Sequence, residues 1–180
     1  MKNLRLILPS LLLAALTASG CWLVSGQFTV SEDLPTPLNV SGPGALFAAP
    51  IDLNDQNTYK DHKSDLKDLV DCAVLGTFRN NSSIAITIEV WMTTGLTNYT
   101  MESQLAGATK VWGPLSLAAN ASKKISWDDS AKLFSKAGKT ALLNEVKGDG
   151  LFTLYAKGTG ASYNFSLLDG VAVIVIDVGK

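Results

Sequence analysis

The chain has 180 residues, and 47% of them are hydrophobic, so it can fill the core of one globular domain but not of two ordinary ones. Its 15 basic and 16 acidic residues nearly cancel, and Lys123-Lys124 is the only adjacent basic pair. Nucleic acid is therefore a poor candidate partner, because binding phosphates needs a concentrated basic patch.

The first twenty residues have the layout of a secretory signal peptide. Lys2 and Arg5 give a positive start, an apolar run covers residues 6–16, and small residues come directly before Cys21. As a helix the apolar run would be roughly 16 Å long, whereas a bilayer core is about 30 Å thick. We therefore expect residues 1–20 to be removed on export rather than kept as a transmembrane helix.

Residues 18–21, Ala-Ser-Gly-Cys, resemble the lipobox of bacterial lipoproteins, although Ala18 stands where leucine is commonest. The resemblance implies that Cys21 is acylated on its sulfur and becomes the N-terminus of a protein anchored in the cell envelope. Trp22, in place of aspartate, implies the outer membrane if the host has two. The alternative is an ordinary cleavage site before Cys21 and a soluble secreted or periplasmic protein. The resemblance covers the leader alone and implies no activity.

The two cysteines lead to two predictions that exclude each other. If Cys21 is acylated, Cys72 is left as a small buried hydrophobe, since it alternates with Val70 and Val74. If Cys21 is not acylated, an exported protein can join Cys21 and Cys72 in a disulfide.

Residues 21–45 are rich in proline, glycine and serine, which predicts a lipid-anchored tether that can contribute one edge strand near Phe28 and Val30. An irregular first part of the domain is the alternative. Residues 46–180 are predicted to form the single domain.

The domain begins with a predicted strand and a predicted helix. Residues 45–53 alternate as a short strand, with one face formed by Phe47, Ala49, Ile51 and Leu53. Residues 55–68 predict a polar surface helix, capped by Asp55 or Asn57, whose inward residues are Tyr59, Leu66 and Leu69.

Two alternating runs, residues 69–79 and 84–94, flank the polar residues 80–83 and predict an antiparallel hairpin with one face in the core. The core face of the first run consists of Val70, Cys72, Val74 and Phe78. The core face of the second consists of Ile84, Ile86, Ile88, Val90 and Met92.

The middle of the chain is less regular. Residues 97–120 predict a loop and then one strand near Leu115, because the apolar runs are interrupted by Gly107, Gly113 and Pro114. Residues 124–127 predict a short strand. Asp128 or Asp129 then caps a predicted helix, weak at Gly138, that turns inward Ala131, Phe134, Ala137, Leu142 and Val146.

The last third predicts three strands, at residues 151–157, 163–168 and 171–178, with Asp169-Gly170 as a two-residue hairpin turn. The final strand is apolar on both faces, which is typical of a central strand with cover on both sides. The preceding helix is expected to cover one of them.

Together the elements predict a mainly β fold, an antiparallel β-sandwich of about seven to nine strands with one or two packed helices. An α+β single sheet with helical cover is the alternative.

No catalytic motif is visible, so we predict no catalytic residues and no cofactor. The only histidine, His62, is expected to be solvated. Asp61, Asp65 and Asp68 would share a helical face and are weak candidates for calcium ligands. Interspersed lysines neutralise that face, so we expect an ordinary charged helix and no metal.

Trp91 is the best candidate for binding. It points away from the core face of its run, together with Thr87, Glu89 and Thr93. An exposed Trp on a flat sheet suits contact with sugar or protein. The alternative is that the helix or a neighbouring strand covers it.

We therefore expect a non-enzymatic, membrane-anchored envelope lipoprotein that binds an envelope protein or a polysaccharide. The alternative is a secreted or periplasmic hydrolase that uses carboxylates such as Glu89, or Asp128 and Asp129.

Overall fold

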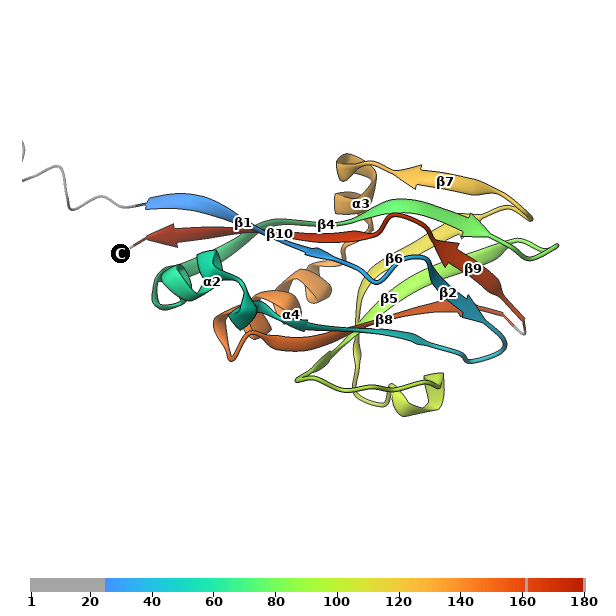
Figure 1. The fold of residues 1–180 in the computed structure, drawn as a ribbon, viewed down its shortest axis with the longest axis horizontal. Coiled ribbons are helices and arrows are strands. Elements are labelled where there is room, and N and C mark those ends of the chain that lie inside the picture. Colours follow the sequence, from blue (N-terminus) through green and yellow to red (C-terminus); the bar gives the residue numbers. More distant parts are fainter. Residues whose placement is uncertain (1–24, 161, 180) are drawn as a thin grey trace, which may run out of the picture.

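The computed structural model describes residues 25–160 and 162–179 as two antiparallel β-sheets packed face to face, with helices on more than one side of the sandwich (Figure 1). The predicted fold class, a mainly β sandwich with packed helices, is confirmed, with ten strands among these residues. The predicted signal peptide and Cys21 lie outside the described residues. Within the described ranges, no helix combines the length and apolar character needed to cross a bilayer.

The larger sheet is built around the fifteen-residue strand β4 (Leu66–Asn80). Its other strands are β1 (Ser25–Asp33), β2 (Leu38–Ser41), β7 (Ser122–Ile125), β9 (Asn164–Leu167) and β10 (Val171–Gly179). Strands β10 and β9 pair one after the other along one edge of β4, and β7 pairs with the opposite edge. Strands β1 and β2 pair with the outer edges of β10 and β9.

The smaller sheet has the order β3-β8-β5-β6. Its strands are β3 (Phe47–Asp52), β5 (Ile86–Thr94), β6 (Thr109–Leu117) and β8 (Leu151–Thr159). As predicted, β5 turns Ile86, Ile88, Val90 and Met92 into the core, whereas Ile84 precedes the strand and is 53% exposed. The opposite face of β5 therefore points away from the larger sheet.

The predicted hairpin of β4 and β5 is wrong, because the two strands belong to different sheets. Asn80, fully buried, fixes the crossing between them. Its Nδ2 donates to the carbonyls of Ile84 (2.7 Å) and Ala118 (2.8 Å), and its Oδ1 accepts from the Ser82 N–H (2.8 Å). Alternation identified the strands and most of their core faces. Val70, predicted to face the core, is instead 43% exposed, because the pairing of β4 with β10 shifts register there and skips it. Alternation also does not identify the partner of a strand.

Asp169-Gly170 is not a hairpin turn either. It lies where β9 passes into β10 along the same edge of β4, and Asp169 Oδ1 accepts from the Thr77 N–H at 2.6 Å. Gly76 faces this interruption with φ +137°, and a Cβ there would lie 2.7 Å from the Asp169 carbonyl oxygen. Glycine is therefore required where the two strands meet.

The segment predicted to be a tether is part of the larger sheet from Ser25 onward. Strand β1 pairs with β10 along its whole length, and β2 pairs with β9. The segment buries Val30, Leu34, Leu38 and Val40. Its prolines lie at the bend between the strands or beyond them, so turn-forming residues marked the connections of edge strands rather than a free linker.

The predicted helix over residues 55–68 is shorter than expected. Helix α2 (Asn57–His62) lies between two 3-10 turns, η1 (Leu53–Asp55) and η2 (Lys63–Asp65). Gln56, not Asp55 or Asn57, is the N-cap residue. Tyr59 is buried as predicted, but Leu66 pairs with Val178 as β4 begins. Pairing with β10 overrides the helical pattern there.

Strand β6 continues through Gly113 and Pro114, which had predicted an interruption. The two residues form a bulge opposite Glu89, and Gly113 has φ +102°. A Cβ on Gly113 would lie 2.8 Å from the Ile88 carbonyl oxygen. The glycine thus permits the bulge, and the strand extends back to Thr109. The loop before it contains one 3-10 turn, η3 (Glu102–Gln104).

Two helices replace the one predicted after β7. Helix α3 (Trp127–Leu133) is capped by Ser126, and α4 (Lys136–Lys147) by Ser135. The chain breaks at Phe134 and not at Gly138, which is buried and packs against Val111. The helices contact β4 and β6, so they close the side between the sheets instead of covering the final strand.

Ser130 of α3 links the two sheets. Its Oγ accepts from the backbone N–H of Val74 in β4 (2.7 Å) and from Trp112 Nε1 in β6 (3.0 Å). All three residues are buried, and Trp112 also stacks on Phe78 with ring centroids 5.5 Å apart. One hydroxyl thus satisfies a donor from each sheet.

Replacing Ser130 with alanine should lower the free energy of unfolding by about 2–4 kcal/mol, because two buried donors lose their acceptor. Urea denaturation of residues 22–180 measures the change. Ser135→Ala, which removes an exposed helix cap, is the matched control and should lower it by only about 1 kcal/mol. Equal losses in the two variants would contradict the linking role of Ser130.

Candidate functional site

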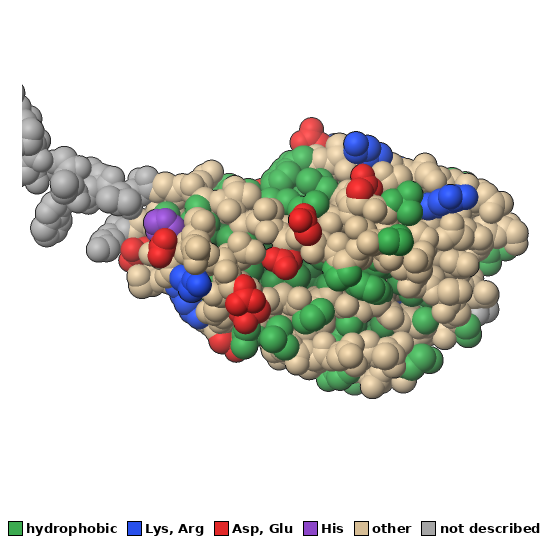
Figure 2. All heavy atoms as spheres, viewed as in Figure 1, with side chains coloured by type: hydrophobic (Ala, Val, Ile, Leu, Met, Phe, Trp, Pro, Cys, Tyr) green, Lys and Arg blue, Asp and Glu red, His purple; other side chains and the backbone are tan. Residues whose placement is uncertain are grey.

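The interior of the sandwich leaves little room for a ligand. Two apolar cavities between the sheets have volumes of about 30 and 20 Å³, enough for a water molecule or two. On the face drawn in Figure 2, hydrophobic side chains appear in the middle of the view among scattered charged groups. The residues predicted to bind a ligand lie outside this interior, on the outward face of the smaller sheet.

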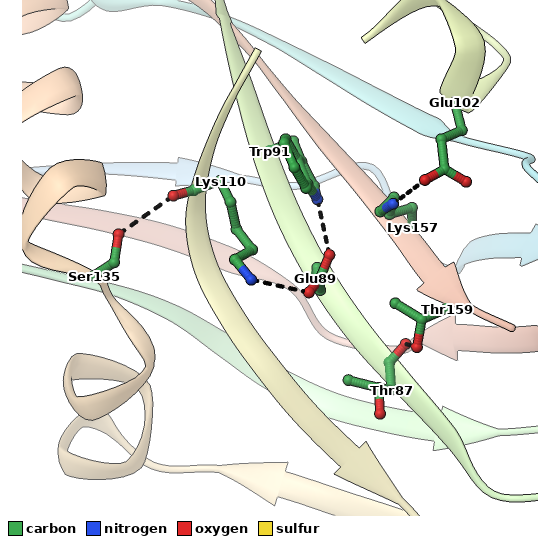
Figure 3. A network of polar contacts seen from close by, with 8 residues as sticks. All are labelled: Thr87, Glu89, Trp91, Glu102, Lys110, Ser135, Lys157 and Thr159. Carbon is green, nitrogen blue, oxygen red and sulfur yellow. Dashed lines mark hydrogen bonds and ion pairs between the residues drawn. The ribbon is translucent and has the colours of Figure 1, made fainter. Parts of the chain in front are cut away.

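The four residues predicted as a binding surface do lie together there. Thr87, Glu89, Trp91 and Thr93 alternate along β5 on the face opposite the core, and all are half-buried. Figure 3 shows the first three of them with the neighbouring polar groups. Trp91 is thus neither freely exposed nor fully covered.

Glu89 fixes the indole of Trp91. Trp91 Nε1 donates to Glu89 Oε2 at 3.1 Å, and Lys110 of β6 donates to Oε1, also at 3.1 Å (Figure 3). The Glu89 side chain is only 12% exposed, so this pairing holds its charge in a partly desolvated position. Both carboxylate oxygens are engaged.

Lys157 of β8 approaches Trp91 from the other side. It pairs in register with Glu89, and its ammonium nitrogen lies 5.1 Å from the centroid of the Trp91 ring. Lys157 is 7% exposed and forms an ion pair with Glu102 of η3 (Figure 3). A buried cation with both a carboxylate and an aromatic face as partners is satisfied, and it restricts the indole.

The segment that carries Glu102 covers the β8 half of this face. Tyr155 is fully buried beneath it, and Tyr99 stacks on Tyr155 with ring centroids 5.5 Å apart. The Tyr155 hydroxyl lies 2.6 Å from Thr97 Oγ1, and Thr153 Oγ1 accepts from the Thr97 N–H. Trp91 therefore lies at the border between covered and open surface.

The three aspartates that were weak candidates for calcium ligands do not share the predicted helical face. Asp61 lies in α2, Asp65 in η2 and Asp68 in β4, so the helical face that would have joined them does not form. Across residues 25–160 and 162–179, no group of three or more His, Cys, Asp or Glu side chains is arranged to hold a metal ion. His62 is half-buried and stacks on Phe28 at 5.2 Å.

The carboxylates considered for a hydrolase lie on separate elements. Glu89 is bonded to Trp91 and Lys110, whereas Asp128 and Asp129 occupy the first turn of α3. Carboxylates at that position favour the positive end of a helix dipole. No hydrogen bond within the described ranges links the two places.

Cys72 is a buried hydrophobe, as one of the two predictions had it. It is 1% exposed on the inward face of β4, and burial raises the pKa of its thiol from 9.0 to about 12. Cys21, the partner in the alternative disulfide prediction, lies outside the described residues.

Cys72 should therefore react with maleimide at pH 7.5 only after denaturation, because the thiolate is the reactive form. The raised pKa also has a consequence for stability. The contribution of the protonated thiol is complete below pH 9 and is lost as the pH rises toward 12. Between pH 9 and 12, Cys72→Ala should lose less stability than the wild type. Rapid maleimide labelling of the folded wild-type protein would contradict the burial of Cys72.

Sequence reasoning missed the two lysines and the carboxylate that surround the predicted row. A signal existed for Lys157, since it shares a face with Thr153 and Tyr155 in a predicted strand. Lys110 fell in a segment predicted as loop. Glu102 comes from a 3-10 turn whose position only the packing on β8 defines.

No protein-family model matches the chain, and a search of curated proteins found no match. Among solved structures, it is similar to that of Desmodium yellow mottle tymovirus, with 8% identity, a TM-score of 0.31 and coverage of 88% of this chain and 89% of the other. The chain is also similar to the structure of infectious bursal disease virus Gx strain, with 8% identity and a TM-score of 0.32. That match covers 84% of this chain and 32% of the other. A third match is the structure of Mud crab tombus-like virus, with 12% identity, a TM-score of 0.32 and coverage of 88% of this chain and 82% of the other. Similarities this low carry no argument about function.

Proposed function

We propose that this protein is a lipoprotein of the bacterial envelope, anchored by a lipid on Cys21 in the outer membrane, and that its sandwich is a non-enzymatic binding module. Its ligand is an envelope protein or polysaccharide. The leader supports the anchoring, through its charged start, its short apolar run and the lipobox-like residues 18–21.

The observation that carries the binding role is the restrained state of Trp91. Its indole is held at the open border of a sheet by the hydrogen bond to Glu89 and by the ammonium group of Lys157. An aromatic side chain ordered before binding loses little entropy when a ligand arrives. Such residues contribute strongly to recognition.

The start of β1 bears on where the module would act. Ser25 already pairs with Gly179, so an anchor at Cys21 would be separated from the sheet by only a few residues. Four residues span at most about 14 Å when fully extended. A lipid there would keep the domain against the membrane surface, and a partner would have to lie within the same layer.

The anchoring is tested by the mass of the mature protein extracted in detergent. We expect cleavage before Cys21 and an added mass from acyl chains, and Cys21→Ser should release the protein into the soluble fraction because no chain can be attached. A free amine on Cys21 together with a Cys21–Cys72 disulfide would contradict the lipoprotein proposal.

Trp91→Ala should reduce capture of the partner from native envelope extracts by roughly tenfold or more, as expected for an aromatic anchor. The fold should persist, because Trp91 is only half-buried. Ile84→Ala, which removes exposed apolar surface elsewhere, is the matched control and should leave capture unchanged. Equal capture by all three proteins would contradict the role of Trp91, and circular dichroism checks that each is folded.

A further inference from the structure

A polar groove opens at the Thr93 end of the Trp91 row. It has a volume of about 280 Å³ and lies between α4 and the segment that leads into β6. Its polar lining consists of Thr93, Thr94, Tyr99, Thr109, Asn144 and Glu145. Its apolar lining is formed by small or flexible groups, Met92, Ala106, Ala108 and Ala141. The groove therefore offers hydroxyl, amide and carboxylate groups beside a modest apolar surface.

Several of these polar groups are available to a ligand, Asn144 and Glu145 among them. The side chains of Asn144 and Glu145 form no hydrogen bond to other described residues, and Glu145 takes part in none of the ion pairs found there. Both come from consecutive positions of α4, whose helical backbone fixes their spacing. A partner could thus engage an amide and a carboxylate without breaking existing contacts.

The charge of the groove selects against acidic ligands. Glu145 forms no ion pair with a described residue, and desolvation, followed by the nearby charge of Asp149, raises its pKa. A ligand with carboxylates or phosphates would be repelled, whereas hydroxyl and amide N–H groups can donate to Glu145.

The lining suits a sugar better than a peptide. Peptides commonly bind by adding a strand to a free edge or by inserting large apolar side chains into pockets. The apolar lining of this groove consists of Met92 and three alanines, with no large aliphatic or aromatic side chain forming an apolar pocket. Tyr99, already restrained by stacking on Tyr155, adds an aromatic surface.

We propose that this groove binds an N-acetylated hexosamine unit of an uncharged glycan. The inference rests on the proposed binding function and names the class of its ligand. The acetyl methyl group would lie against the alanine side chains, the amide N–H would donate to Glu145, and ring hydroxyls would bond Asn144 and the threonines. Trp91 would contact the next sugar along the row.

The test is an NMR titration of the isotope-labelled mature protein in detergent micelles with chitotetraose, a tetramer of N-acetylglucosamine. We expect saturable shifts at residues 93–94, 106–109 and 141–145. Asn144→Ala and Glu145→Ala should each weaken binding about tenfold, the effect of losing one good hydrogen bond. Lys147→Ala, an exposed neighbour in α4 that does not line the groove, is the matched control and should not change the affinity.

Cellotetraose, which lacks the acetamido group, should bind at least tenfold more weakly than chitotetraose. Equal binding of the two sugars, shifts confined to other residues, or no saturable shift would overturn the inference. The inference would also be overturned if the Asn144→Ala variant lost capture of a protein from envelope extracts and not capture of a glycan. If Trp91-dependent capture from envelope extracts persists while chitotetraose does not bind, the groove assignment fails and the binding function stands. If that capture is also absent, both fail.

Discussion

The packing of the two sheets depends on the hydrogen bonds that the Ser130 hydroxyl accepts at one side of the sandwich. Ser130 accepts a backbone N–H from β4 and the indole N–H from β6, so both sheets are tied to α3 at one buried point. Helix α4 packs closely on β6, because Gly138 has no side chain and lets the helix backbone approach Val111. These contacts seal the side between the two sheets. They also set the position of α4, and with it the wall of the groove that carries Asn144 and Glu145.

The outward face of the smaller sheet obeys the same physical constraint, that buried polar groups need partners. Lys157 is nearly inaccessible, and Glu102 and the ring of Trp91 offset the desolvation of its charge. Glu89 is held between Lys110 and Trp91. These pairings leave a restrained aromatic residue at the border of a covered area, beside a groove with available polar groups. The proposed binding function rests on this arrangement.

Several elements were predictable because their local pattern survives packing. The inward face of β5, the strand character of residues 47–52 and the burial of Tyr59 and Cys72 all follow from alternation or helical spacing. The row from Thr87 to Thr93 was predicted for the same reason. Its neighbours Lys110, Lys157 and Glu102 were not, because they come from three elements that only the sheet order and η3 bring together.

The sequence by itself determined the β class and the core face of β5, and it is the sole basis for the proposed leader. Composition and periodicity are local properties, and they report which side of an element is buried. Only the tertiary structure decided that β4 and β5 part into separate sheets, that β9 and β10 share one edge of β4, and that residues from Ser25 onward belong to the domain. Strand partners are chosen by backbone hydrogen bonds between distant segments, and alternation carries no information about which segments these are.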